Sequence, residues 1–194
     1  MNQDAPARLR LFEPIAPTQA GTAGSVAEAL ANVTPGRPVV IEAVSGGSRI
    51  QAHKRDAEVR LFDATLADVT DQHPAIVDAV RTIDADTLIV DGTVRTDAAS
   101  GEVNAVFSDA LLIDGAPLLG RPLSDRIDLL GEVAPTKLMV QRTLTPFPAV
   151  AEAFAAHVRE QGGCEVVVRD LDAPYTPGTP YIPDEGAAAW VVAL

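Results

Sequence analysis

The chain has 194 residues, enough for one domain with a sizeable hydrophobic core. Hydrophobic residues make up 47% and charged residues 22% of it, which excludes wholesale disorder. The formal net charge of −12 leaves little material for the basic face that duplex binding needs, so we expect no direct nucleic-acid binding. Since the sequence contains neither a membrane-spanning apolar run nor a signal-peptide pattern, we expect a cytoplasmic protein without membrane contact.

The first half of the chain predicts a helix, three strands and a second helix. The first helix covers 25–33, with Ser25 as its N-cap. The second helix covers 72–83 and carries Pro74 in its first turn. Between the helices, short turns separate three strand-like runs, which is typical of an antiparallel meander; the runs cover 37–44, 48–54 and 58–64.

The second half predicts strands interrupted by two further helices. One helix covers 121–133 with Ser124 as its N-cap, and the other covers 147–163 and ends at two glycines. Strands and helices alternate irregularly, so we expect an α+β fold rather than a regular βαβ array. The predicted strands are 87–96, 104–114, 137–144, 164–171 and 187–194.

Five stretches carry a collinear similarity to a known family: SRIQAHK at 48–54, EVRLFDATLADVTDQHPAIVDAVR at 58–81, LIVDG at 88–92, LLIDGAPLLGRPLSDRIDLL at 111–130 and DLDAPYTPG at 170–178. Together they resemble the adenylation (nucleotidyltransferase) domain of ATP-dependent DNA ligases. The resemblance implies antiparallel sheets with flanking helices that enclose a nucleotide cleft. We expect an N-terminal extension at 1–22 and an adenylation-like domain at 23–194, with neither an OB domain nor a separate DNA-binding domain.

The family's chemistry begins with a lysine that attacks the α-phosphate of ATP to form lysyl-AMP. That lysine belongs to the pattern Lys-x-Asp-Gly-x-Arg, which aligns with residues 44–49 here. Gly47 and Arg49 match the pattern, but Val44 occupies the nucleophile position and Gly46 the aspartate position. Because valine has no nucleophilic atom, we expect no catalytic residue and no lysyl-AMP formation.

Other motifs of the family depart in the same direction, while residues of the scaffold are retained. The family implies ATP and Mg²⁺ as cofactors, but with these departures we expect neither a cofactor nor a metal site in this chain. The departures are Asp63-Ala64-Thr65 for Ser-Arg-Asn, Thr93 for the glutamate of Asp-Gly-Glu, Cys164-Glu165 for Glu-Gly, Arg169 for a lysine, and Val192 and Leu194 for two phosphate-binding lysines. The retained residues are Asp68-Val69-Thr70, Asp114-Gly115, Arg126, Pro174-Tyr175 and Trp190.

Individual side chains admit both functional and structural interpretations. Arg49 and Arg169 could form a residual anion site, or structural ion pairs with Glu42 or Asp91. Lys54 is interpreted as a solvated turn lysine rather than a relocated nucleophile.

The remaining candidates for chemistry are interpreted structurally. Cys164 is the only cysteine, which excludes a disulfide framework, and we expect a buried, inert thiol. The three histidines lack metal-ligand spacing and are expected on the surface or on helices. We expect four aspartates to shape turns rather than to bind a metal: Asp63, Asp91, Asp109 and Asp114.

Three functions follow from these observations. The preferred hypothesis is a non-catalytic, ligase-like binding or scaffold protein, with a protein partner or a homodimer. The apolar strand at 187–194 supports it, because a chain-terminal strand is expected to present an open edge. The first alternative is a non-covalent nucleotide sensor that uses Gly47, Arg49 and Arg169. The second is a divergent nucleotidyltransferase or ligase component in DNA repair that needs a partner.

Overall fold

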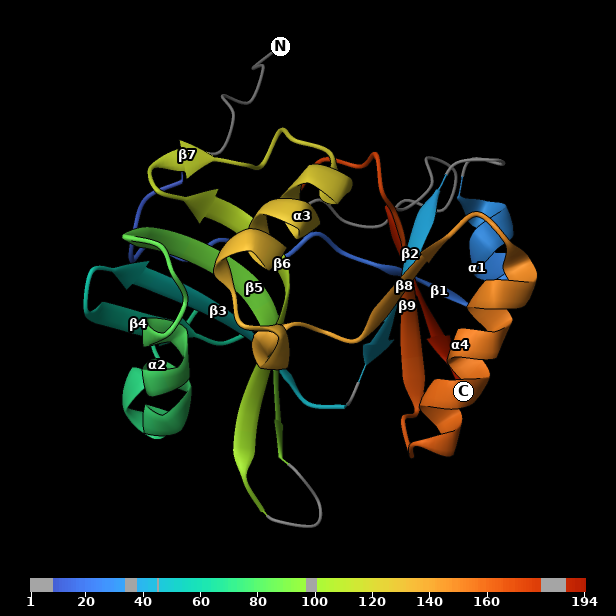
Figure 1. Ribbon diagram of the computed structural model, residues 1–194, viewed down its shortest axis with the longest axis horizontal. Helices are drawn as coiled ribbons and strands as arrows, with labels where there is room; N and C mark the ends of the chain where they lie inside the picture. The colour runs from blue at the N-terminus through green and yellow to red at the C-terminus, as the bar shows by residue number, and fades with distance from the viewer. Residues whose placement is uncertain (1–8, 34–37, 45, 97–100, 179–187) are drawn as a thin grey trace.

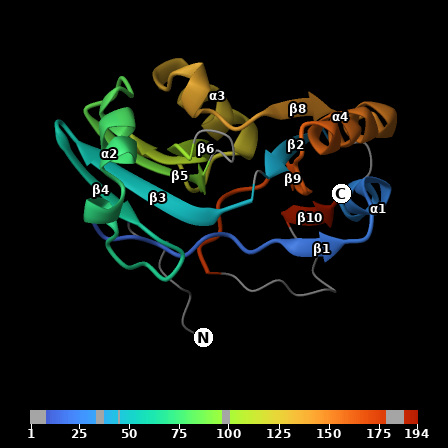
Figure 2. The same cartoon turned by 90° about the horizontal axis from the view of Figure 1, so that it is seen from below.

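Two five-stranded sheets face each other in the computed structural model, which describes residues 9–33, 38–44, 46–96, 101–178 and 188–194 (Figures 1 and 2). The first sheet has the order β1-β10-β9-β2-β8, and its strands are β1 (Gly21–Ala23), β2 (Val39–Val44), β8 (Arg142–Thr145), β9 (Glu165–Asp170) and β10 (Ala189–Ala193). The second sheet has the order β4-β3-β5-β6-β7, and its strands are β3 (Ser48–Arg55), β4 (Glu58–Phe62), β5 (Thr87–Thr96), β6 (Val103–Ile113) and β7 (Ala116–Pro117). The predicted α+β class is confirmed.

Helices cover the outer face of each sheet (Figure 2). Helices α1 (Val26–Asn32) and α4 (Pro148–Glu160) bury their apolar residues against β2, β9 and β10. Helices α2 (Pro74–Arg81) and α3 (Leu123–Val133) pack against β3, β5 and β6, and α3 also contacts Val40 of the first sheet. Two short 3₁₀ turns complete the elements, at Thr70–Gln72 and Thr136–Leu138.

The predicted helix caps have different outcomes. At α1, the Ser25 side chain accepts a hydrogen bond from the Glu28 backbone N–H at 3.1 Å, so this N-cap is confirmed. At α3, Ser124 lies inside the first turn and Pro122 is the N-cap, so the prediction of Ser124 is wrong. The Ser124 N–H instead donates to the carbonyl of Leu171, which fixes the start of α3 against the first sheet.

The predicted meander is wrong, because β2 and β3 belong to different sheets. Strand β2 pairs with β8 and β9, whereas β3 pairs with β4 and β5. Gly47 lies at the crossing between the sheets with φ +134, and a Cβ there would lie 1.9 Å from the carbonyl oxygen of Val94. A glycine therefore allows the chain to pass close to β5 as it changes sheet.

The C-terminal strand has no open edge, which contradicts the expectation from the sequence. Strand β10 pairs in parallel with β1 and antiparallel with β9, so it lies inside the first sheet. The edge is taken by β1, a three-residue strand that the sequence pattern did not predict. The predicted strand at 137–144 is also shorter than expected, since Thr136–Leu138 form a 3₁₀ turn and only Arg142–Thr145 pair with β2.

The segment at 9–20, called here the N-terminal strap, covers the second face of the β3–β5–β6 sheet (Figure 2). Leu9, Leu11 and Ile15 pack against Ile89 and Leu111 on that face.

Among the described residues, no helix is long and apolar enough to cross a membrane.

Gly92 in β5 provides a test of the close packing of β5 on β6. A Cβ on Gly92 would lie 2.2 Å from the carbonyl oxygen of Val106, whereas a Cβ on Gly131 in α3 would meet nothing within 4 Å. We expect Gly92→Ala to lower the free energy of unfolding by about 1–3 kcal/mol through overpacking. We expect Gly131→Ala to raise it by about 0.5–1 kcal/mol through helix propensity. Urea unfolding of both variants measures the difference, and equal effects would contradict the packing of β5 on β6.

Candidate functional site

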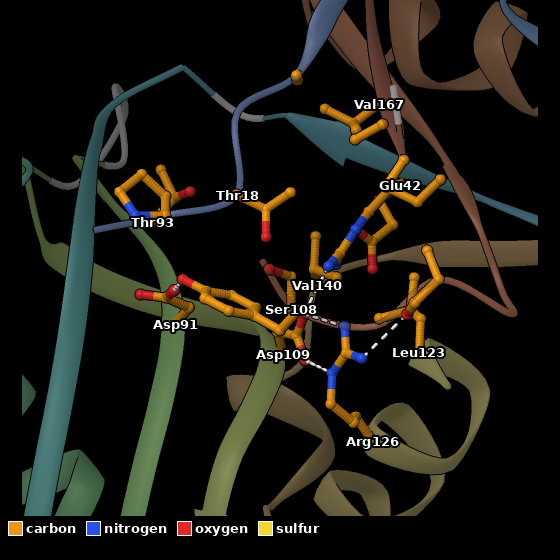
Figure 3. A pocket seen from close by; sticks show the side chains of 18 of the residues that line it. Thr18, Glu42, Asp91, Thr93, Ser108, Asp109, Leu123, Arg126, Val140 and Val167 are labelled. Atoms are coloured by element: carbon orange, nitrogen blue, oxygen red, sulfur yellow. Dashed lines mark hydrogen bonds and ion pairs between the residues drawn. The ribbon is translucent and has the colours of Figure 1, made fainter. Parts of the chain in front are cut away.

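A cavity of about 260 Å³ lies between the two sheets (Figure 3). The first sheet contributes walls from β2, β9 and β10, including Val44 and Val167. The second sheet contributes walls from β3, β5 and β6, including Arg49 and Thr93. Thr18 and its neighbours in the N-terminal strap close one side. The cavity is therefore assembled from segments that are far apart in the sequence.

A buried aspartate on β6 joins the two sheets at the base of this cavity. Asp109 accepts two hydrogen bonds from Arg126 of α3, at 2.7 and 3.0 Å, and one from Arg169 of β9. Burial alone would raise the pKa of the Asp109 carboxyl, but the two guanidinium groups outweigh it and hold that pKa below its usual value. Asp109 is therefore charged at neutral pH and shared by both arginines.

Glu42 extends this ion network within the first sheet. Its carboxylate accepts a hydrogen bond from Arg169 at 3.3 Å and lies 3.4 Å from the guanidinium of Arg142 on β8. Arg142 also donates to the carbonyl of Ser108 on β6, at 3.3 Å. Arg169 thus bonds to carboxylates on both sheets, and Arg142 forms a second link between them. Of the interpretations left open for Arg169, the structure shows an ion pair with Glu42.

A second polar cluster surrounds Asp91 on β5. The carboxylate lies 2.8 Å from the guanidinium of Arg49, and it accepts hydrogen bonds from Gln51 and from the Tyr175 hydroxyl. Burial raises the pKa of Asp91, while the charge of Arg49 opposes that rise. Burial and the neighbouring Asp91 also raise the pKa of Tyr175, so its hydroxyl stays protonated and donates. Of the interpretations left open for Arg49, the structure shows an ion pair with Asp91.

His53 continues this cluster beneath the N-terminal strap. Its Nδ1 accepts the backbone N–H of Phe12 at 2.8 Å, and its Nε2 lies 2.9 Å from Oε1 of Gln51, which also accepts the N–H of Ile15. An imidazole that accepts at Nδ1 is neutral and carries its proton on Nε2. Burial, assisted by the charge of Arg49, lowers the pKa of His53 to about 4. Alternate residues of β3 therefore hold the strap against the sheet.

The candidate site residues separate into two groups. Arg49 and Arg169 both line the cavity, while Gly47 lies at the sheet crossing outside the wall. Val44, at the position expected for the nucleophile, also lines the cavity.

Several interpretations of single residues are wrong. Lys54 is buried, and its ammonium group donates to the carbonyls of Arg81 and Ile83, because the end of β3 packs beneath α2. His53 is fully buried on a strand, and Cys164 is exposed where the chain leaves α4.

Two of the four aspartates expected in turns lie in turns, and the other two do not. Asp63 accepts from the backbone N–H groups of Thr65 and Ala67, and Asp114 forms a turn with positive φ. Asp91 and Asp109 lie instead inside strands, in ion pairs. Within the part of the chain that the structure describes, no three His, Cys, Asp or Glu residues could hold a metal ion.

Thr18 lines the cavity, and Gln51 and His53 hold the adjoining strap; none of the three was predicted as a site residue. The signal in the sequence was the alternation Arg49-Gln51-His53, which places three polar side chains on one face of a strand. The strap that receives them has no strand or helix pattern, so its position over this face could not be predicted.

Comparison with known proteins finds relatives that are named DNA ligases. No family model matches it. A "Probable DNA ligase" from Streptomyces avermitilis is 36% identical over 199 residues, which covers 88% of this chain and 38% of that protein. One from Kineococcus radiotolerans is 36% identical over 188 residues, covering 88% of this chain and 37% of that protein. The chain is homologous to the adenylation domain of ATP-dependent DNA ligases.

Solved structures share the fold of this ligase homologue. The superposition on the ligase domain of Mycobacterium tuberculosis LigD has a TM-score of 0.71 at 23% identity. It covers 94% of this chain and 59% of that domain. The superposition on a mycobacterial DNA ligase D complexed with ATP and MES has a TM-score of 0.72 at 22% identity. It covers 94% of this chain and 61% of the ligase D chain. The homologue spans less than two fifths of the length of the curated relatives described above.

Removal of the shared carboxylate tests the ion network. We expect Asp109→Asn to lower the free energy of unfolding by about 3–5 kcal/mol, because it leaves Arg126 and Arg169 buried without their shared counter-charge. Asp78→Asn removes the partner of Arg81 in an exposed pair on α2 and should change the free energy by about 1 kcal/mol or less. Chemical denaturation of both variants gives the comparison. A small effect at Asp109 would show that the network does not hold the sheets together.

The buried histidine gives a pH dependence with a defined sign. The folded state keeps His53 neutral down to about pH 4, whereas the unfolded chain binds a proton near its ordinary pKa of 6.5. Stability from this group is therefore complete above pH 6.5 and is lost as the pH falls towards 4, by about 3 kcal/mol. His53→Gln should flatten that part of the pH profile, and His157→Gln, on the exposed side of α4, should leave it unchanged. Urea titrations from pH 7 to 4 measure the slope.

Proposed function

We propose that this ligase-related domain is non-catalytic and acts as a binding or scaffold protein. The observation that carries the proposal is Val44, which lines the cavity at the position that aligns with the lysine nucleophile of the family. An isopropyl side chain has no amine with which to form a phosphoramidate bond to AMP. The similarity to relatives that are named ligases supports a common origin, and this chain spans less than two fifths of their length.

The positions of the two lysines support the loss of lysyl-AMP formation. The ammonium group of Lys54 is bound to two carbonyls beneath α2, and Lys137 is exposed in the 3₁₀ turn before β8. Neither belongs to the described cavity wall. Because covalent catalysis requires near-attack geometry, neither lysine replaces the missing nucleophile.

An exposed apolar surface supports binding to a protein partner or to a second copy of the chain. Leu144, Phe147 and Val150 are exposed by 51%, 65% and 44%, at the junction of edge strand β8 and helix α4. The segment 143–151 contains no charged residue, although the chain carries a net charge of −12. Contact at this surface buries apolar area without bringing like charges together.

A second candidate function is non-covalent nucleotide sensing in the cavity. The cavity itself and the position of Arg49 and Arg169 in its wall favour this function. It requires neither Val44 nor a metal, so it is compatible with the missing nucleophile. A third candidate, a ligase component completed by a partner, would need that partner to supply the attacking amine.

Covalent labelling tests the proposal. The purified chain is incubated with ATP labelled at the α-phosphate and Mg²⁺, and the protein is analysed by denaturing electrophoresis and intact mass. We expect no adenylated species, while an active ligase treated in parallel becomes labelled. A labelled chain would overturn the proposal, and the variant Lys54→Arg would then show whether Lys54 carries the AMP.

A further inference from the structure

We propose that a second copy of this chain docks on the apolar surface where β8 leads into α4, so that the protein forms a two-fold symmetric dimer. This inference rests on the proposed non-catalytic function and names its partner. It is carried by three properties of the segment 144–150, called here the β8–α4 surface. These are its exposed apolar side chains, the absence of charge along it, and the position of β8 at the edge of its sheet (Figure 2).

Exposed apolar side chains gather on the β8–α4 surface. Among the described residues, four large hydrophobic side chains are exposed, and three of these lie here. Single exposed apolar side chains are ordinary on a protein surface, whereas a contiguous group of them marks an interaction site. Within the segment only Thr145 is buried, and the exposed members are Leu144, Pro146, Phe147, Pro148, Ala149 and Val150.

Hydrogen bonds fix the backbone of this surface. The Thr145 hydroxyl accepts the N–H of Phe147 at 3.0 Å, at the turn between β8 and α4. The carbonyl of Phe147 then accepts the N–H groups of Val150 and Ala151, at 3.1 and 3.2 Å. Because the backbone is already ordered, burial of these side chains on association loses less conformational entropy than the ordering of a loose loop would.

The exposed face of α4 extends this surface. Ala149, Ala153 and Ala156 are exposed and are spaced by four and three residues, so they lie along one face of the helix. A stable interface buries about 800 Å² on each partner, which the three large side chains alone cannot supply. We therefore expect the contact to run from β8 along the first two turns of α4.

The charge pattern identifies the partner. The segment 143–151 contains no charged residue, although the net charge of the chain is −12. Two copies of the chain repel each other, so they associate most readily where neither copy presents a charge. A basic partner would instead be attracted to acidic side chains, which this segment lacks. The pattern thus favours a second copy over a basic protein.

The edge of β8 has a geometry that suits two-fold pairing. The Ala43 N–H donates to the carbonyl of Gln141 at 2.9 Å, and hydrogen bonds between antiparallel strands fall on alternate residues. Thr143 and Thr145 therefore bond towards β2, while Leu144 directs its N–H and carbonyl towards the open edge. Two such edges can pair antiparallel across a two-fold axis, with Leu144 of each copy opposite Leu144 of the other.

Pro146 limits this pairing to a dimer. It occupies the next position that faces the open edge, and proline has no N–H to donate. Strand pairing therefore ends two residues after Leu144, and the apolar side chains supply the rest of the contact. A two-fold contact uses the same surface on both copies, so it closes at two chains and does not propagate.

Sedimentation equilibrium of the full chain, from micromolar to submillimolar concentration, tests the inference. We expect the mass of two chains at the upper end of this range. Added NaCl should strengthen the dimer, because salt screens the repulsion between two acidic copies. The mass of one chain at every concentration would overturn the inference. Weakening of the dimer by salt would also overturn it, since ion pairs would then hold the copies together.

A substitution at the N-cap of α4 locates the contact. Phe147→Asp removes the aromatic ring and adds a charge, while aspartate is favoured at an N-cap and so preserves the helix. We expect it to raise the dissociation constant of the dimer by roughly 30-fold or more. It should also abolish the rise of the melting temperature with protein concentration that a dimer shows.

The matched control is Leu66→Asp, at the exposed large hydrophobic residue that follows β4 in the other sheet. It should leave the dissociation constant unchanged. Equal constants for the variants at Phe147 and Leu66 would overturn the assignment of the surface. Covalent labelling by ATP would refute the proposed function, whereas an unlabelled chain that stays monomeric would refute this inference alone, so the two failures are distinguishable.

Discussion

The carboxylate of Asp109 is the interaction on which the arrangement of the two sheets depends. It lies on β6 of the second sheet and binds Arg169 of the first sheet together with Arg126 of α3. Desolvation of these charges is costly, and only the complete set of bonds compensates for it. The sheets therefore cannot slide relative to each other without breaking ion pairs that are almost fully buried. The cavity is the space that remains above this fixed base.

The side of the cavity that the N-terminal strap closes is held differently, by a row of polar side chains on β3. Arg49, Gln51 and His53 alternate along the strand, and each bonds to a backbone group of the N-terminal strap. The strap forms little regular structure, so these bonds replace the pairing that a further strand would provide. Gln51 also donates to Asp91, which links the strap to the ion pairs of the cavity. Both walls are thus positioned by buried polar contacts.

Local structure could be predicted from the sequence where the hydrophobic pattern was strong. The prediction failed where strand pairing joins segments that are distant in the sequence. Strand β5 was predicted with its observed bounds because apolar residues dominate its first half. The separation of β2 from β3 was missed, since it depends on pairs such as Val39 with Asp170. Strand β1 was missed because Gly21–Ala23 has no pattern, and β10 then appeared to be an edge. In the site, Arg49 and Arg169 were identified, whereas the pairing of Arg126 with Asp109 has no signature in local spacing.

Two of the residues on which the proposed loss of catalysis rests lie outside the ion network, although Arg169, which aligns with a lysine of the family, lies within it. Val44 and Thr93 lie on the cavity wall, and neither has a place in the ion network that joins the sheets. Substitutions at such positions remove chemistry at little cost in folding free energy, because a valine or threonine needs no buried counter-charge. Arg126 and Asp109 are different, since loss of either leaves the other buried and unpaired. The proposed loss of catalytic chemistry at Val44 and Thr93 is therefore compatible with an intact ion network and an intact fold.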